Sequence, residues 1–347
     1  MAYTRFPGVP LKPLEHLSNV GLPENGTAKL QTISYFAIVI IGIDGDNCHL
    51  CKSMKRLGII VMTAAAILSC LMASAQGGGD ALPFVRTEFG PALTGTAGAA
   101  VASAETGPWG VFRNASAMGF PGCLQGVAGE FRAGAGNFGF SGAGMAKIMN
   151  RIGFGLGASY LGGDSIGGFR THDILVSGGI AYGIKDYLSI GINTRFAKQV
   201  LTESISYEGA SIDINAMAKI SYAMTATIGL SALGHKVVSA SGTEYRQPAN
   251  VYAGAEYVLG LEGHKLALDA MGEYYFSGNF GAALGASFTY EDMVTVRAGY
   301  RYASEWCVIP SHFALGLGGK YMGFTFDATF AVLPSSYITC ASIGFNF

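Results

Sequence analysis

The end of the chain, residues 293–347, alternates between apolar side chains on one parity and polar or small ones on the other. Between residues 293 and 302, for example, Val294, Val296 and Tyr300 alternate with Thr295 and Arg297. The same alternation recurs over residues 311–320, 324–333 and 336–347. A period of two is that of a half-buried β-strand, and about ten residues is the length of a tilted strand that crosses a bilayer. The pattern therefore predicts the last four strands of an outer-membrane β-barrel.

Fourteen strands are predicted when the same alternation is followed towards the N-terminus. They cover residues 125–133, 137–148, 152–161, 171–183, 187–198, 207–220, 224–235, 248–259, 264–276, 280–290, 293–302, 311–320, 324–333 and 336–347. Connections after even-numbered strands are mostly short, whereas several after odd-numbered strands are long, namely 162–170, 199–206, 236–247 and 303–310. Outer-membrane barrels have short periplasmic turns and longer external loops.

We therefore expect an all-β protein, a transmembrane antiparallel barrel of about 14 strands over residues 124–347. Its wall would contact the lipid of a bacterial outer membrane, and both termini of the mature chain would lie in the periplasm. The chain ends with its last strand, so that Phe345 and Phe347 form the expected C-terminal signal of the barrel.

Charged residues of the predicted strands share the parity opposite the apolar set. A cation facing lipid costs about 2–4 kcal/mol at mid-bilayer, so this parity is expected to face the lumen. The expected lumen charges are Arg195, Asp213, Lys219, Asp269, Glu273, Arg297, Arg301, Lys320 and Asp327. They either pair with each other and with a plug, or form a selectivity surface for a solute. A selectivity surface should have one dominant sign, so their mixed signs favour a structural role.

The composition agrees with a membrane barrel. Hydrophobic residues make up 50% of the chain and charged residues only 13%, yet no apolar run of helical length lies outside residues 54–75. The 51 glycines, 21 phenylalanines and 17 tyrosines suit small lumen positions and interfacial aromatic residues. A net charge of −1 offers no basic face for nucleic acid.

Residues 54–75 have the three parts of a secretory signal peptide. A basic start, Met54-Lys55-Arg56, precedes the apolar segment 57–72 and the small residues Ala73-Ser74-Ala75, so cleavage is expected after Ala75. Because such signals act at an N-terminus, residues 1–53 are predicted to be an upstream extension that is not part of the native product. A cytoplasmic or leader extension is the alternative. Lipidation at Cys70 is a weaker alternative to cleavage.

Residues 76–123 lack regular alternation and are rich in small side chains. Such a segment suits tight packing inside another structure, so we predict an N-terminal hatch within the lumen.

Enzymatic, metal and cofactor sites are not predicted. The six histidines show no motif spacing, and the pair Cys48 and Cys51 lies in the doubtful extension without a second pair. Cys123, Cys307 and Cys340 remain in the mature chain, too few and too scattered for a zinc site. Glycine-rich stretches lack the following helix of a phosphate loop.

The hatch and the C-terminal half resemble the PorV/PorQ family. The hatch motif consists of Gly90-Pro91 and Gly98 in a run of small residues, followed by Trp109 and Asn114. The C-terminal similarity lies in residues 296–301, 315–321, 326–328 and 345–347. Ala115 and Ala117 replace the Pro and Gly of the family's Asn-Pro-Ala-Gly motif. The resemblance implies a 14-stranded barrel related to FadL fatty-acid transporters, in bacteria that have a type IX secretion system.

Two functions follow from the resemblance. The first is a non-enzymatic docking partner of type IX-like secretion-system proteins or exported cargo, which would bind at the rim. The alternative is a FadL-like transporter of a hydrophobic solute. A purely structural envelope protein is a third hypothesis. Short loops weigh against a large docking surface, and the mixed-charge lumen weighs against transport.

Overall fold

The computed structural model describes residues 80–134, 137–166, 168–203, 205–238, 242 and 244–347, together with 3–5 and 9–11. Within the predicted extension, the structure describes two short paired strands, β1 (Tyr3–Arg5) and β2 (Val9–Leu11). The rest of the extension lies outside the described residues, and so do the predicted signal peptide 54–75 and Cys48, Cys51 and Cys70. No helix in the described ranges has the length and apolar character needed to cross a membrane.

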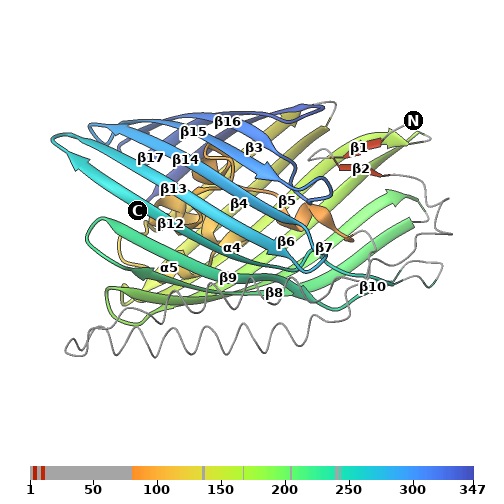
Figure 1. Ribbon diagram of the computed structural model, residues 1–347, viewed down its shortest axis with the longest axis horizontal. Coiled ribbons are helices and arrows are strands. Elements are labelled where there is room, and N and C mark those ends of the chain that lie inside the picture. The colour runs from red at the N-terminus through yellow and green to blue at the C-terminus, as the bar shows by residue number, and fades with distance from the viewer. Residues whose placement is uncertain are drawn as a thin grey trace, which may run out of the picture. The chain divides into compact units, whose positions relative to one another are not determined.

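Fourteen antiparallel strands close into a barrel, which confirms the predicted fold class. Figure 1 shows how the strands are arranged around the hatch. The strands are β3 (Gly126–Gly134), β4 (Asn137–Ile148), β5 (Ile152–Ile166), β6 (Phe169–Gly183), β7 (Leu188–Thr202), β8 (Ile205–Lys219), β9 (Met224–Gly234), β12 (Asn250–Leu261), β13 (His264–Tyr275), β14 (Phe280–Tyr290), β15 (Val294–Ala303), β16 (His312–Tyr321), β17 (Phe324–Val332) and β18 (Tyr337–Asn346). Each strand pairs with its sequence neighbour, and β18 pairs with β3 to close the ring.

The two ends of the barrel differ in their connections. One end, which we call the turn rim, carries the start of β3, the end of β18 and the short turns such as 149–151 and 291–293. Positive φ angles at Met149 and Asn150, and again at Glu291 and Asp292, match the tight turns that preserve strand twist. The opposite end, which we call the loop rim, carries the longer connections, including the small hairpin of β10 (Val237–Val238) and β11 (Glu244–Tyr245).

Two predicted long loops are instead mostly strand. Strands β5 and β6 continue to residues 166 and 169, and β7 and β8 continue to residues 202 and 205, so the loops predicted at 162–170 and 199–206 were wrong. The ladders shift register at Gly162/Ser165 and at Val200/Thr202. Alternation of apolar residues fades there, but backbone hydrogen bonds still extend the ladder.

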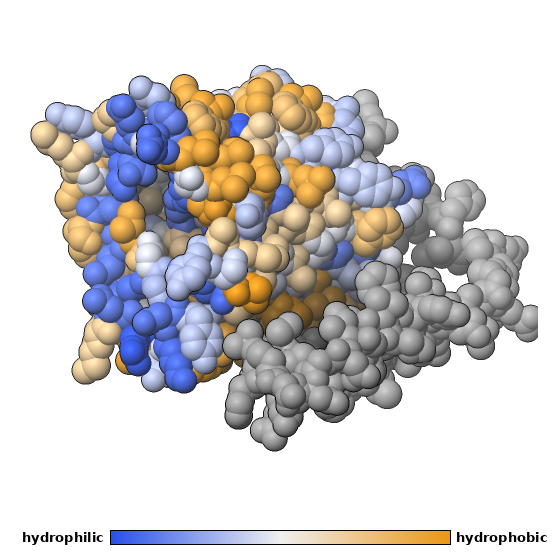
Figure 2. Space-filling view, turned by 60° about the vertical axis from the view of Figure 1, so that its left-hand side comes forward, coloured by the Kyte–Doolittle hydropathy of each residue, from blue (hydrophilic) through white to orange (hydrophobic). Residues whose placement is uncertain are grey.

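The wall has one apolar and one polar face, as the alternation predicts. On β7, for example, Ile192 is 46% exposed on the outside, whereas Asn193 and Arg195 face inward and are buried. Figure 2 shows hydrophobic residues gathered over the wall and hydrophilic ones gathered towards one end of the barrel. The outer face is therefore suited to lipid, and the polar side chains are held inside.

The hatch fills the lumen with short helical turns, coloured orange in Figure 1. They are η1 (Pro83–Arg86), α3 (Pro91–Gly95), η2 (Ala100–Ala102), η3 (Ala104–Trp109), α4 (Gly110–Arg113) and α5 (Ser116–Gly119). Pro91 occupies the first turn of α3, where its missing N–H leaves no hydrogen bond unmade. Gly90 before it has a φ of 86°, which favours glycine.

The hatch runs through the barrel from the loop rim to the turn rim. At the loop rim, Ala81 N donates to Arg246 O at 2.8 Å and Ser277 Oγ donates to Asp80 Oδ2 at 3.2 Å. At the turn rim, Phe347 N donates to Gln125 O at 3.1 Å. The described hatch thus begins at the rim opposite the C-terminus.

The predicted start of the mature chain, Gln76, lies outside the described residues, so the prediction that both mature termini lie in the periplasm stays a prediction.

Glycines on the inner wall let the hatch backbone approach the strands closely. A Cβ atom added to Gly299 would lie less than 3.0 Å from backbone atoms of Thr96, and one added to Gly191 would lie as close to backbone atoms of Ser116. The hatch thus packs against bare strand backbone on these two sides.

Replacing Gly299 with alanine is expected to lower the free energy of unfolding by about 1–3 kcal/mol, because the new methyl group overlaps Thr96. Gly272→Ala is the matched control, since nothing lies within 4 Å of its added Cβ. Thermal unfolding of the purified barrel in detergent compares the two. Equal stability of the two variants would contradict the close packing of the hatch at Gly299.

Candidate functional site

A buried network centred on Glu273 of β13 fastens the hatch to the wall. Glu273 Oε2 accepts hydrogen bonds from Arg86 Nη2 and Arg113 Nη2 of the hatch, both at 2.9 Å. Its Oε1 accepts from the hydroxyl of Tyr275 at 2.8 Å and from Arg301 of β15. All four side chains of this ionic cluster are almost fully buried. One wall carboxylate therefore holds two separate turns of the hatch.

A second network centred on Arg195 lies on another side of the hatch. Arg195 pairs with Asp213 of β8 and donates to the carbonyl oxygens of Val85, at 2.9 Å, and Phe112. Asp213 Oδ1 in turn accepts from Ala232 N at 2.8 Å, where β9 departs from regular pairing with β8. The pair thus joins the hatch to an irregular part of the wall.

A third set of bonds connects the hatch to β3. Gly90 N donates to Glu130 Oε2 at 3.0 Å, and Arg132 Nη2 donates to Glu88 O at 2.7 Å. Glu130 and Arg132 also pair with each other, and the Arg132 guanidinium lies 4.8 Å from the centroid of the Phe89 ring. These are local contacts to hatch residues 88–90.

The remaining predicted lumen charges are placed differently. Arg297 Nη1 pairs with Asp327 Oδ1 at 2.8 Å across β15 to β17. Asp269 is buried opposite Glu256 of β12. Most of the predicted lumen charges therefore form ion pairs, and Lys219 and Lys320 lie exposed near the turn rim.

Sequence reasoning missed several partners of these charges. Glu130 and Arg132 share the lumen parity of β3, so the alternation could have revealed them. Four others lie in the hatch, which has no periodicity to mark them: Arg86, Glu88, Glu105 and Arg113. Glu105 pairs with Lys265, which the alternation places on the lumen parity of β13 with Asp269 and Glu273.

The hatch motif residues occupy buried or conformationally restricted positions. Gly98 has a φ of 84° and adjoins Glu88. Trp109 is buried with its ring 6.2 Å from that of Phe112. Asn114 Nδ2 donates to Val101 O at 2.8 Å.

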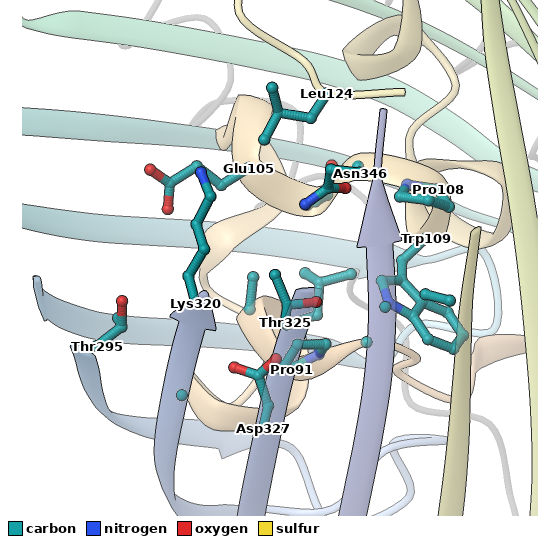
Figure 3. Close-up of a pocket in the computed structure, with 18 of the residues that line it drawn as sticks. Pro91, Glu105, Pro108, Trp109, Leu124, Thr295, Lys320, Thr325, Asp327 and Asn346 are labelled. Carbon is teal, nitrogen blue, oxygen red and sulfur yellow. The ribbon is translucent and has the colours of Figure 1, made fainter. Parts of the chain in front are cut away.

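A cavity of about 240 Å³ lies at the turn-rim half of the lumen, between the hatch and strands β15 to β18 and β3. Its hatch side is largely apolar and includes Phe89, Leu93 and Trp109. Its wall side is polar and includes Thr295, Arg297, Lys320, Thr325, Asp327 and Asn346. In Figure 3 the Lys320 side chain extends towards Glu105 at the mouth, whereas Asp327 lies beside Pro91. We call this the turn-side cavity.

A smaller cavity of about 40 Å³ lies nearer the loop rim and is called the loop-side cavity. Thr87, Glu88 and Thr94 of the hatch border it, and Ile309 from the connection 304–311 also lines it. Its wall side comprises Arg132, His312, Thr329, Ala331, Leu333, Ile338 and Cys340. Both cavities therefore lie on the same side of the hatch.

No metal-binding group of three or more His, Cys, Asp or Glu side chains is present in the described part of the chain. Cys123, Cys307 and Cys340 are free and buried. Burial raises the pKa of the Cys123 thiol to about 11, which keeps it protonated at neutral pH. The described site therefore offers shape, apolar surface and fixed charge.

Comparison with known proteins gives matches at the level of structure. No family model and no curated protein matches the sequence. The Ralstonia pickettii toluene transporter TbuX matches with a TM-score of 0.58 and 12% identity, over 75% of this chain and 98% of that one. The monoaromatic hydrocarbon channel CymD matches with a TM-score of 0.55 and 13% identity, over 74% and 97%. A Pseudomonas aeruginosa FadL homologue matches with a TM-score of 0.51 and 12% identity, over 74% and 98%.

The fold is that of a FadL-like outer-membrane barrel. Each of these matches covers nearly the whole of the solved chain and about three quarters of this one. The resemblance to the narrower PorV/PorQ family is not confirmed by these matches. At 12–13% identity the FadL-like barrels establish architecture, and function has to be argued from the lumen itself.

Proposed function

We propose that this FadL-like barrel conducts small hydrophobic solutes across the outer membrane and holds them in the turn-side cavity. The observation that carries the proposal is the cavity itself, which lies inside a closed barrel and has an apolar hatch side. Support also comes from the titles of two structural neighbours, a toluene transporter and a monoaromatic hydrocarbon channel. Transport was the alternative hypothesis from the sequence, and the comparisons favour it over docking.

The size of the cavity favours a small solute. Sites for drug-sized ligands occupy roughly 300–1,000 Å³, and an engineered apolar cavity of about 150 Å³ binds benzene. A cavity of about 240 Å³ therefore suits a single substituted ring or a short aliphatic molecule. Phe89, Leu93 and Trp109 supply apolar contacts to such a molecule.

The polar wall suits a solute with one polar substituent. Thr295, Thr325 and Asn346 offer hydroxyl and amide groups opposite the apolar hatch surface. Arg297 and Asp327 neutralise each other, so the wall does not present an unpaired charge at that point. Aromatic alcohols and unsubstituted hydrocarbons are thus the solutes to compare.

The test is uptake of labelled toluene and of a labelled monoaromatic alcohol by cells that produce the barrel. Ala92→Phe places a ring in the turn-side cavity and is expected to reduce uptake. The control, Ala270→Phe, adds the same ring on the exposed lipid face of β13. If cells that produce the wild-type barrel take up no more solute than cells without it, the transport proposal is rejected.

Docking of type IX-like secretion-system proteins or exported cargo is the other hypothesis. It rests on the PorV/PorQ resemblance of the hatch and C-terminal motifs. Purification of the tagged barrel from native membranes, followed by mass spectrometry, separates the two. If secretion subunits are recovered and a strain that lacks the barrel takes up the solute at the wild-type rate, docking replaces transport as the proposed function.

A further inference from the structure

We infer that solutes cross the lumen along one seam, between hatch residues 87–94 and strands β16, β17, β18 and β3. This inference rests on the proposed transport function and adds the route. It joins the loop-side and turn-side cavities into one path from rim to rim. The hatch does not have to leave the barrel for this path to open.

On the β5 and β14 sides the hatch packs directly against glycines of the wall. An added Cβ at Gly153 would lie 2.6 Å from Met118 O, and one at Gly157 would lie 2.5 Å from the Phe112 ring. On the β14 side, an added Cβ at Gly285 would lie 2.7 Å from Thr96 Cβ. At these three positions the hatch therefore touches β5 and β14 with no space for a solute.

The buried charge networks close the same sides more firmly. Glu273 binds two hatch arginines, and Arg195 binds two hatch carbonyl groups. Opening a path there would expose several buried ions in a nearly dry environment, which is costly. These contacts fix the hatch as a wall of the path.

The two cavities are lined by different inward residues of the same strands. On β17 the inward residues Thr325 and Asp327 line the turn-side cavity, and the next inward residues, Thr329 and Ala331, line the loop-side cavity. On β18 the order is repeated, from Asn346 and Gly344 to Cys340 and Ile338. No inward residue separates the two cavities on β17, and only Ser342 separates them on β18.

The barrier between the two cavities consists of a few hydrogen bonds and the largely buried ion pair of Glu88 with Arg301 at 3.3 Å. Gly90 N is held by Glu130 at 3.0 Å, and Glu88 O by Arg132 at 2.7 Å. The following α3 has five residues and lies against β16 and β17. A small shift of residues 89–94 would join the cavities and leave Glu88, which pairs with Arg301, and the Glu273 and Arg195 networks in place.

A reversible cross-link tests the seam. Thr94 and Thr329 border the loop-side cavity from opposite sides, so Thr94→Cys with Thr329→Cys can lock the hatch to β17. The matched control is Val111→Cys with Ser177→Cys, across a side where Ser177 Oγ donates to Val111 O at 2.6 Å. Cys123, Cys307 and Cys340 are replaced by serine in both, and mass spectrometry measures cross-linking by a short thiol-reactive reagent or by oxidation.

The seam predicts that the locked Thr94/Thr329 variant loses uptake of labelled toluene to the level of cells without the barrel. Reduction of its disulfide restores uptake, and the locked Val111/Ser177 control transports at its unlocked rate. Uptake that persists in the locked Thr94/Thr329 variant, or that stops only in the control, overturns the seam. Absence of uptake in every version, the wild type included, instead rejects transport itself.

Native Cys340 gives a second measurement that does not depend on forming a cross-link. Its thiol lines the loop-side cavity, so modification by a small thiol reagent in a Cys123→Ser, Cys307→Ser background is expected to slow uptake. Saturating toluene is expected to slow the modification. A barrel that is fully modified at Cys340 and still transports at the unmodified rate would also overturn the seam.

Discussion

Replacing Glu273 with alanine is expected to lower the free energy of unfolding by about 3–5 kcal/mol and to expose the hatch to protease. The carboxylate is the shared acceptor for Arg86, Arg113 and Arg301, all nearly inaccessible to solvent. Its removal leaves three buried guanidinium groups without their central partner. Thermal unfolding in detergent measures the first effect, and limited proteolysis followed by mass spectrometry locates cleavage in residues 80–123.

A matched carboxylate on the surface provides the control. Glu208 pairs with Lys198, but both side chains are well exposed, so Glu208→Ala should change stability by only about 0–1 kcal/mol. Glu273→Gln keeps the shape and part of the hydrogen bonding, and its loss should lie between the two. A Glu273→Ala variant as stable as Glu208→Ala would show that the hatch is held by other contacts.

Replacing Arg195 with methionine is also expected to lower the free energy of unfolding by about 3–5 kcal/mol. Asp213 is fully buried and would become an unpaired charge, and the carbonyl oxygens of Val85 and Phe112 would lose their donor. Methionine retains most of the side-chain volume, so the loss reports on charge and hydrogen bonding. The measurement is the midpoint of thermal unfolding, with barrel closure followed by gel mobility of unheated samples.

The double variant Arg195→Met with Asp213→Asn separates these contributions. Removing the second charge should recover part of the stability, because no unpaired ion remains. Recovery should stay incomplete, since the hatch carbonyl groups still lack a donor. A double variant that is less stable than Arg195→Met alone would mean that Asp213 acts mainly through Ala232 N.

The strands could be predicted because the bilayer imposes a strict rule on them. One face must be apolar and the other can be polar or small, so residues 293–347 and most earlier strands show a period of two. The rule fails where the wall leaves the apolar zone. The alternation therefore predicts loops at the extensions of β5 to β8, although Lys198 and Glu208 still pair across the β7–β8 ladder.

The interior was predicted in outline but not in its connections. Parity placed Arg195, Glu273 and Arg301 inside, but their partners in the hatch are more than 80 residues away in sequence or lie in irregular turns. Spacing along the chain carries no information about such contacts. The cavities likewise depend on where α3 lies against β16 and β17, which no local pattern determines.

The passage of the hatch from rim to rim also has a consequence for biogenesis. The hatch precedes β3 in the chain, and β3 meets the last strand, β18, to complete the ring. The N-terminal and C-terminal strands therefore come together around a segment that has already been synthesised. Buried arginines from that segment find their acceptors on β13 and β15, in the middle of the wall. Pairing of β3 with β18 thus encloses the hatch and its buried arginines within the closed sheet.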